Sequence, residues 1–120
     1  MKVEPRQRRY TVGVGAVKVE ITDCGAIALE PDEQVTFTTP QGGEYDVTRK
    51  SWGFFATPSL NGRLARFNLR PVLVKGADQY FILLVEKGCE ALFYEYIGQH
   101  PYTIVLWLDG DLAAAISRDA

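Results

Sequence analysis

The chain is organised around residues 47–77, which read VTRKSWGFFATPSLNGRLARFNLRPVLVKGA. This segment holds six of the thirteen basic residues and none of the fifteen acidic ones, so it carries +6 against −8 for the rest of the chain. It also contains one Trp, three Phe and two Pro, which makes it too apolar for a disordered basic tail. We therefore expect an ordered, basic and aromatic connection between two β-rich halves.

A length of 120 residues predicts a single domain, 1–120, that can bury roughly two-thirds of its unfolded surface without a metal or a disulfide. The net charge of −2 argues against bulk binding to nucleic acid or membranes, and leaves RNA only to a local basic patch. The sequence has no apolar run of the roughly 18 residues that a membrane helix needs, and its first residues lack a signal-peptide signature. We expect a cytoplasmic protein with no membrane partner.

Metal-binding and catalytic side chains are sparse. Cys24, Cys89 and His100 are too few for a zinc site and lack its motif spacing. The cysteines are typical of buried thiols in a reducing compartment, although the sequence leaves a disulfide between them open. The acidic turn at 109–111 has no further carboxylate spaced to complete a magnesium site, and the sole histidine accompanies no nucleophile motif. We expect no cofactor, no metal and no catalytic residue.

The first half of the chain is predicted to form mainly strands. Residues 1–10 are polar and rich in arginine, which indicates a mobile arm. Strict alternation over 17–22 predicts a half-buried strand, followed by a turn at 23–25. Residues 34–39 and 44–50 flank a four-residue turn and predict a hairpin.

Residues 58–67 are open to two interpretations. Thr57 and Pro58 suit a helix start, and apolar residues recur at helical spacing. These are Leu60, Leu64 and Phe67. The step Asn61-Gly62 costs a helix ~1 kcal/mol at the glycine alone, and instead favours a type I′ hairpin turn. We prefer the helix, because Pro58 is awkward in a strand.

The second half predicts two strands, 71–75 and 80–86, a helix over 88–97 and a last strand over 102–108. The strands are apolar on both faces, which is typical of central strands covered on both sides. Residues 112–120 are expected as a frayed or helical tail. The fold class is therefore α+β, with one mixed, mostly antiparallel sheet of six or seven strands. The predicted helix covers one face, and either the N-terminal strands or a second copy of the chain covers the other.

The run KSWGFFATPSLNGRL at 50–64 resembles a segment of a small uncharacterised bacterial domain family. With the strands and helix around it, the likeness covers roughly residues 34–108. The resemblance implies a bacterial origin and a stand-alone small domain. That family has no known activity, so the resemblance implies no chemistry.

Basic side chains beside hydroxyl and amide donors predict a site for phosphate or carboxylate. The candidate ligand-binding residues are Arg49, Lys50, Ser59, Asn61, Arg63 and Arg66. The alternative is that these cations are solvated and paired with the acidic remainder of the protein. The neighbouring aromatics Trp52, Phe54 and Phe55 could stack on nucleobases, but strand alternation favours a core position for at least one of their faces.

Three functions follow from these observations. The first is a non-enzymatic binding or accessory domain, dimeric, whose basic surface over 47–77 takes an anionic small molecule or an acidic protein surface, with RNA less favoured. The second is an enzyme for a small phosphorylated or carboxylated metabolite held by Arg63 and Arg66, although acid–base groups are missing. The third is a purely structural dimerisation or scaffold subunit, because several strands are apolar on both faces.

Overall fold

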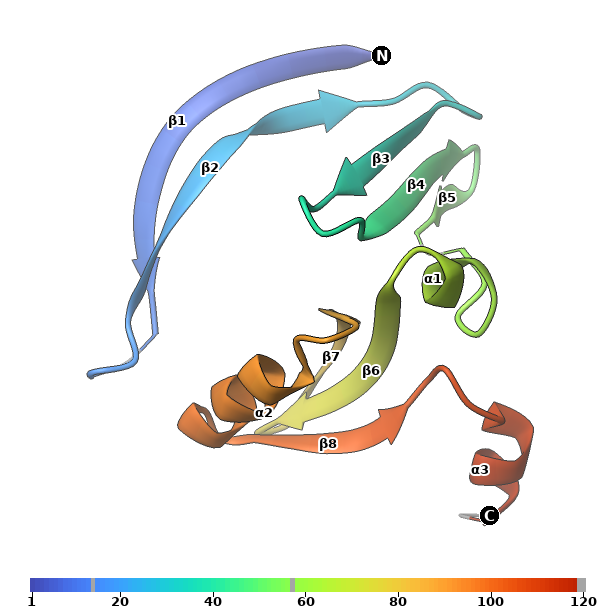
Figure 1. Ribbon diagram of the computed structural model, residues 1–120. Coiled ribbons are helices and arrows are strands. Elements are labelled where there is room, and N and C mark those ends of the chain that lie inside the picture. The colour runs from blue at the N-terminus through green and yellow to red at the C-terminus, as the bar shows by residue number, and fades with distance from the viewer. Residues whose placement is uncertain (14, 57, 119–120) are drawn as a thin grey trace. The chain divides into compact units, whose positions relative to one another are not determined.

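The computed structural model describes residues 1–13, 15–56 and 58–118 (Figure 1). The strands are β1 (Lys2–Val12), β2 (Val19–Ala28), β3 (Gln34–Thr38), β4 (Glu44–Lys50), β5 (Gly53–Phe55), β6 (Leu69–Gly76), β7 (Gln79–Glu86) and β8 (Tyr102–Trp107). The helices are α1 (Arg63–Arg66), α2 (Glu90–Gln99) and α3 (Leu112–Arg118). The chain divides into two compact units: the first is Met1–Gln34 with Thr48–Phe55, and the second is Val35–Val47 with Ala56–Ala120.

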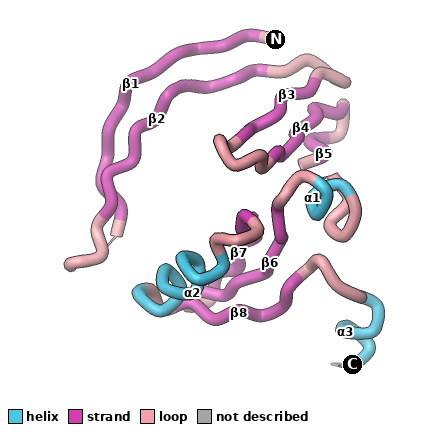
Figure 2. Tube along the Cα trace, in the orientation of Figure 1, coloured by secondary structure: helices cyan, strands magenta, loops and turns pink. Residues whose placement is uncertain are grey.

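The prediction of one sheet with six or seven strands is wrong. The strands form three small sheets, in the orders β1-β2, β3-β4-β5 and β7-β6-β8 (Figure 2). The α+β class itself holds, because short helices accompany these mostly antiparallel strands. The error arises because alternation in a sequence marks a strand and its buried face, whereas the identity of the neighbouring strand depends on contacts far along the chain.

In the first unit, β1 and β2 form a long antiparallel hairpin. The arm expected at 1–10 is a strand over most of its length, and the turn expected at 23–25 lies within β2. A bulge between Pro5 and Arg8 lets β1 continue past its proline. Gly25 of β2 lies opposite Pro5. A residue with a Cβ would not fit there, because a Cβ at Gly25 would lie 2.4 Å from the carbonyl oxygen of Glu4.

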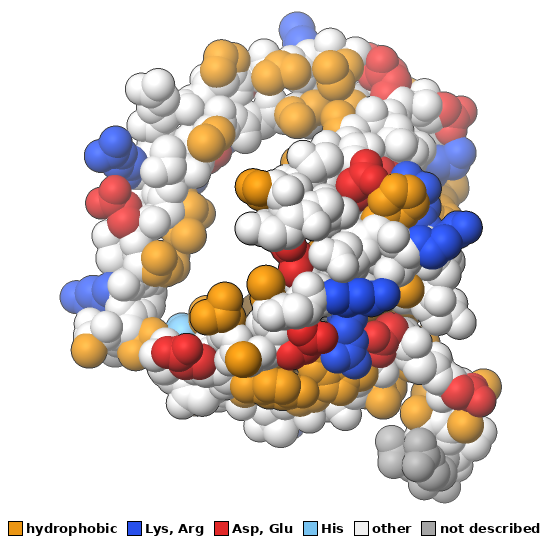
Figure 3. Space-filling model, viewed as in Figure 1, with side chains coloured by type: hydrophobic (Ala, Val, Ile, Leu, Met, Phe, Trp, Pro, Cys, Tyr) orange, Lys and Arg blue, Asp and Glu red, His pale blue; other side chains and the backbone are white. Residues whose placement is uncertain are grey.

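The bulge also keeps the apolar pairs of this hairpin on one face. Val3 lies opposite Ile27 before the bulge, and Val12 lies opposite Val19 after it. All four side chains are exposed, and Figure 3 shows hydrophobic side chains along these strands among charged ones. Leu29 is the one buried hydrophobic residue in the described part of the first unit. The hairpin is thus stabilised mainly by its backbone ladder and cross-strand pairs.

The hairpin predicted over 34–39 and 44–50 is confirmed, since β3 and β4 are hydrogen-bonded neighbours. The Thr39 amide donates to the Gly43 carbonyl at 3.0 Å and closes the turn. Strand β5 adds a short third strand on β4, with Phe54 opposite Arg49.

The helix expected over 58–67 is reduced to the single turn α1. Residues 59–62 form a turn, in which the Ser59 hydroxyl accepts the Arg63 amide at 2.8 Å and takes the place of a capping side chain. Asn68 follows the helix with a φ of +71°, the left-handed conformation in which many helices end. The expected cap Thr57 lies outside the described residues.

In the second unit, β6 runs between β7 and β8 and is antiparallel to both. The strands β7 and β8 are therefore parallel to each other, and β6 lies between them. The predicted helix 88–97 is confirmed as α2, shifted by two residues. Its Phe93 packs with Val72, Val74 and Val85 in the core. Helix α3 occupies most of the expected tail, and residues 119–120 lie outside the described part.

Candidate functional site

The six predicted ligand-binding residues belong to both units. Arg49 and Lys50 end strand β4 in the first unit. The turn before α1 carries Ser59 and Asn61, and α1 itself carries Arg63 and Arg66, all in the second unit. The basic segment therefore contributes two sets of side chains, each with its own surroundings.

Arg63 is an ion-pair partner of a buried carboxylate. Its Nε donates to Oδ2 of Asp46 at 2.6 Å, and the Thr36 hydroxyl donates to Oδ1 of the same carboxylate at 2.7 Å. The guanidinium also lies 4.4 Å from the ring centroid of Phe67. The hydrogen bonds from Thr36 and Arg63 hold the pKa of Asp46 below its ordinary value of 3.8. Arg63 is thus largely neutralised inside its own unit.

The two basic residues of β4 differ in their partners. The Lys50 ammonium lies 2.6 Å from Oδ1 of Asp32 and is paired. The Arg49 guanidinium donates to the carbonyl oxygen of Leu29 at 2.6 Å, which is a neutral acceptor. Within the described residues Arg49 has no carboxylate at ion-pair distance, so no neighbouring carboxylate compensates its positive charge.

Arg70 joins three elements of the second unit. Its Nε donates to Asp109 at 2.8 Å, its Nη1 donates to Glu90 at 3.4 Å, and its guanidinium stacks 4.0 Å from the centroid of Trp107. Arg66 is exposed and has no charged partner among the described side chains. Three of the six basic residues of the segment, Lys50, Arg63 and Arg70, are thus paired with carboxylates, as in the alternative that the sequence left open.

Ser59 and Asn61 line a cavity of about 630 Å³ in the second unit. The other polar side chains around it are Asp109 and Asp111, so its walls are acidic rather than basic. Asp111 also accepts the Ala114 amide at 3.1 Å and thereby caps α3. In the described part of the chain no three His, Cys, Asp or Glu side chains gather as a metal site would require. This cavity does not suit an anion.

The aromatic residues of the segment are exposed, which corrects the expectation of a core position. The exposed fractions are 71% for Trp52, 56% for Phe54 and 55% for Phe55. The reason is that β5 is only three residues long and lies at the edge of its sheet, so that neither of its faces is covered. We call residues 49–55 the aromatic hairpin.

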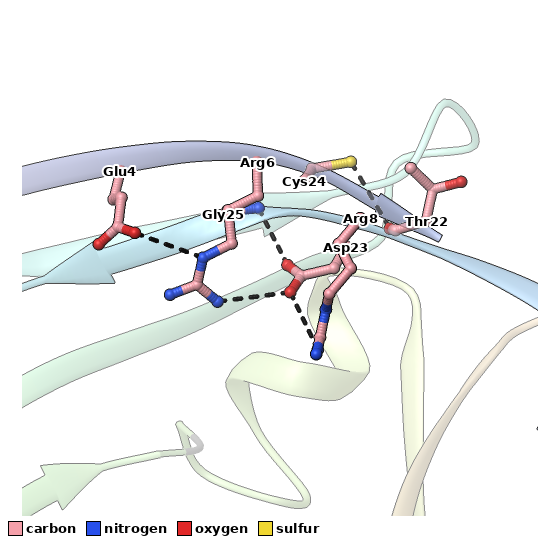
Figure 4. Close-up of polar contacts among 7 residues, drawn as sticks. All are labelled: Glu4, Arg6, Arg8, Thr22, Asp23, Cys24 and Gly25. Atoms are coloured by element: carbon pink, nitrogen blue, oxygen red, sulfur yellow. Dashed lines mark hydrogen bonds and ion pairs between the residues drawn. The ribbon is translucent and has the colours of Figure 1, made fainter. Parts of the chain in front are cut away.

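The arginines of the expected arm form a second basic cluster on β1 (Figure 4). Arg6 and Arg8 approach Oδ2 of Asp23 at 3.4 and 3.3 Å. The pKa of Asp23 is lowered, first by the amide of Gly25, which donates to Oδ1 at 3.1 Å, and then by these arginines. The cluster is therefore at least partly neutralised.

Both cysteines are free thiols, with Cys24 exposed and Cys89 half-buried. The expectation that both are buried is thus wrong for Cys24, which lies in strand β2 of the first unit. None of the helices in the described parts of the chain is long and apolar enough to span a membrane.

The carboxylate partners Asp46 and Asp109 were missed by sequence reasoning. A signal for Asp46 was present, because Thr36 and Asp46 lie equally far from the hairpin turn and so face each other across it. Asp109 is 39 positions from Arg70, and nothing local connects the two.

Comparison with protein-family models, with curated proteins and with solved structures finds no match. The functional argument therefore depends on the geometry described above.

Proposed function

We propose that the protein is a non-enzymatic binding domain that docks an acidic protein partner through the aromatic hairpin. The observation that carries this proposal is the exposure of Trp52, Phe54 and Phe55 within four consecutive positions. Exposed clusters of large apolar side chains are rare on monomeric proteins and mark interaction sites. Trp and Arg are also among the residues that contribute most to binding energy at protein interfaces.

The charge around the hairpin favours an acidic partner. Arg49 of β4 lies directly opposite Phe54 of β5. Among the described residues its guanidinium donates only to a neutral acceptor, a backbone carbonyl. The surrounding segment 47–77 has no acidic residue to repel such a partner. A complementary negative surface would be attracted to this hairpin and oriented on it before the aromatic side chains are buried.

A small anionic ligand has less support, because Arg63 and Lys50 already have carboxylate partners and the cavity at Ser59 is acidic. An enzyme has less support as well. The pKa of Asp46, the carboxylate beside Arg63, is lowered, which is the wrong direction for proton transfer near neutral pH. The cytoplasmic location, the bacterial origin and a homodimer are further parts of the proposal.

The test uses site-specific photo-crosslinking. A photoreactive phenylalanine analogue replaces Trp52 in one protein and exposed Tyr94 on α2 in the control protein. We expect an acidic protein to be crosslinked from position 52 and not from position 94. The absence of any protein specific to position 52 contradicts the proposal.

The captured protein is then purified and titrated against the Trp52→Ala and Arg49→Gln variants. We expect Trp52→Ala to weaken binding by about tenfold or more, as truncation of a central aromatic does. Arg49→Gln should slow association and reduce its dependence on salt. Equal affinities for the wild type and both variants would show that the contact lies elsewhere.

A further inference from the structure

Strand β7 is an unprotected sheet edge. In the described parts of the chain it pairs with β6 alone, so the backbone groups on its other side meet no strand. Its sequence, QYFILLVE, has no charge, proline or glycine between Gln79 and Glu86. Natural edge strands usually carry such residues or a bulge, because an unguarded edge pairs with other chains.

Two other outer strands, β8 and β1, are protected. The pairing of β8 with β6 is interrupted by a register shift between Leu73 and Val74. Strand β1 carries one lysine and three arginines among its eleven residues. Compared with β8 and β1, β7 has the composition that suits pairing.

The exposed face of β7 is apolar. Tyr80 and Ile82 are each 60% exposed, and they lie opposite Lys75 and Leu73 of β6. Residues directly opposite share a face, so these side chains lie on the side of the sheet away from the core around Val72. Pairing at the β7 edge would extend this apolar face.

The two ends of β7 are complementary to each other. Lys75 lies opposite Tyr80, with its ammonium 5.7 Å from the ring centroid. At the other end, Oε2 of Glu86 is buried and has no hydrogen-bond partner among the described residues. Glu86 and Tyr80 are six positions apart on one strand and therefore share a face. One end thus offers a cation and a hydroxyl, and the other a carboxylate oxygen that lacks a donor.

We propose that two copies of the chain pair antiparallel through β7, about a two-fold axis at Leu83. This register places Tyr80 opposite the partner's Glu86, and Ile82 opposite the partner's Leu84. Only every second register keeps the apolar faces aligned, because a slip by one residue reverses them. Of the aligned registers, this one places Tyr80 opposite the partner's Glu86, so that the carboxylate gains a donor once its side chain turns out of the buried position that it has in the single chain. The contact is isologous, so each pair occurs twice and the assembly closes as a dimer.

Dimerisation is tested by sedimentation velocity over a wide concentration range, about 5 to 500 μM, since self-association depends on concentration. We expect the wild type to dimerise and Ile82→Lys to be monomeric, because a charge at this edge blocks pairing. The matched control is Val105→Lys, which changes an apolar residue of β8 that is 49% exposed and should leave the dimer intact. Circular dichroism shows whether each variant is folded. A monomeric wild type, or a dimer that survives Ile82→Lys, overturns the proposal.

The register is tested by crosslinking in a Cys24→Ser/Cys89→Ala background. Chains with Ile82→Cys are mixed with chains with Leu84→Cys under mild oxidation. The mixture should give at least about tenfold more disulfide-linked dimer than either chain alone, because only the mixture places two thiols directly opposite. A dimer of Ile82→Cys chains alone would shift the axis to Ile82 and overturn the assigned role of Glu86. The Tyr80→Cys and Glu86→Cys pair provides a second measurement of the same register.

Discussion

Arg63 and Asp46 form an ion pair in the second unit, with Nε and Oδ2 2.6 Å apart. The pair connects α1 to β4, and Asp46 is only 9% exposed. We therefore expect Asp46→Asn to lower the free energy of unfolding by about 1–2 kcal/mol, because a charged hydrogen bond is lost from a partly buried site. Urea denaturation measures the change. The control Arg66→Gln alters an exposed residue of the same helix and should stay within about 0.5 kcal/mol, so equal effects would contradict the assignment.

The same carboxylate predicts a response to acid. The pKa of Asp46 is lowered in the folded protein, first by the Thr36 hydroxyl and then by Arg63. Its stabilising contribution is therefore complete above the ordinary value of 3.8 and is lost as pH falls through the lower, folded value. Melting temperatures measured down to about pH 2 should fall less steeply for Asp46→Asn than for the wild type. Thr36→Val removes the largest cause and should move the loss toward higher pH, and parallel curves for all three proteins would refute this account.

Patterns within short stretches of the sequence predicted individual helices and hairpins. The spacing of Cys89, Leu92, Phe93, Tyr96 and Ile97 predicted α2, and the turn at 40–43 predicted the β3–β4 hairpin. Sheet organisation was not predictable in the same way, because alternation reveals which face of a strand is apolar but not what covers it. Strand β7 is apolar on both faces, so both faces were expected to be covered, yet Tyr80 and Ile82 on one of them are exposed. The positive charge of segment 47–77 does not reveal a site either. Its Arg63 and Arg70 are paired with Asp46 and Asp109, which lie outside the segment.

Gly76 leaves room for the ring of Tyr102. A Cβ at this position would lie 2.4 Å from Cε1 of Tyr102, which is far too close. That ring is held by neighbouring rings, with centroids 5.8 Å from Phe81 and 5.3 Å from His100. We expect Gly76→Ala to cost about 1–3 kcal/mol in thermal or urea unfolding, as overpacking does.

The control for this substitution is Gly98→Ala in α2. Apart from its chain neighbours and the backbone of its own helix, no atom of the described residues lies within 4 Å of a Cβ built there, and the residue is helical. Alanine should stabilise this position by up to about 1 kcal/mol, because glycine is the poorer helix former. Opposite signs at Gly76 and Gly98 would support the steric explanation, and a loss of similar size at both would exclude it.

Arg70 should not tolerate replacement by lysine. Its guanidinium contacts Asp109 and Glu90 and stacks on Trp107, and a lysine can reproduce the charge but not the fork or the stacking. We expect Arg70→Lys to cost about 1–2 kcal/mol, with a changed Trp107 emission in a Trp52→Phe background. The control Lys75→Arg, at an exposed position, should change neither the stability nor the Trp107 emission. Unaltered stability and emission in Arg70→Lys would mean that charge alone suffices.

Truncation of the two tryptophans should change stability by very different amounts. Trp107 packs against Phe93 with ring centroids 5.7 Å apart, so Trp107→Ala should cost about 3–5 kcal/mol. Trp52 is exposed on the aromatic hairpin, so Trp52→Ala should change stability by less than about 0.5 kcal/mol. Urea unfolding compares the two, and acrylamide should quench Trp52 in a Trp107→Phe protein more than Trp107 in a Trp52→Phe protein. If Trp52→Ala proved as costly as Trp107→Ala, the hairpin would be covered in the folded chain and could not serve as a docking surface.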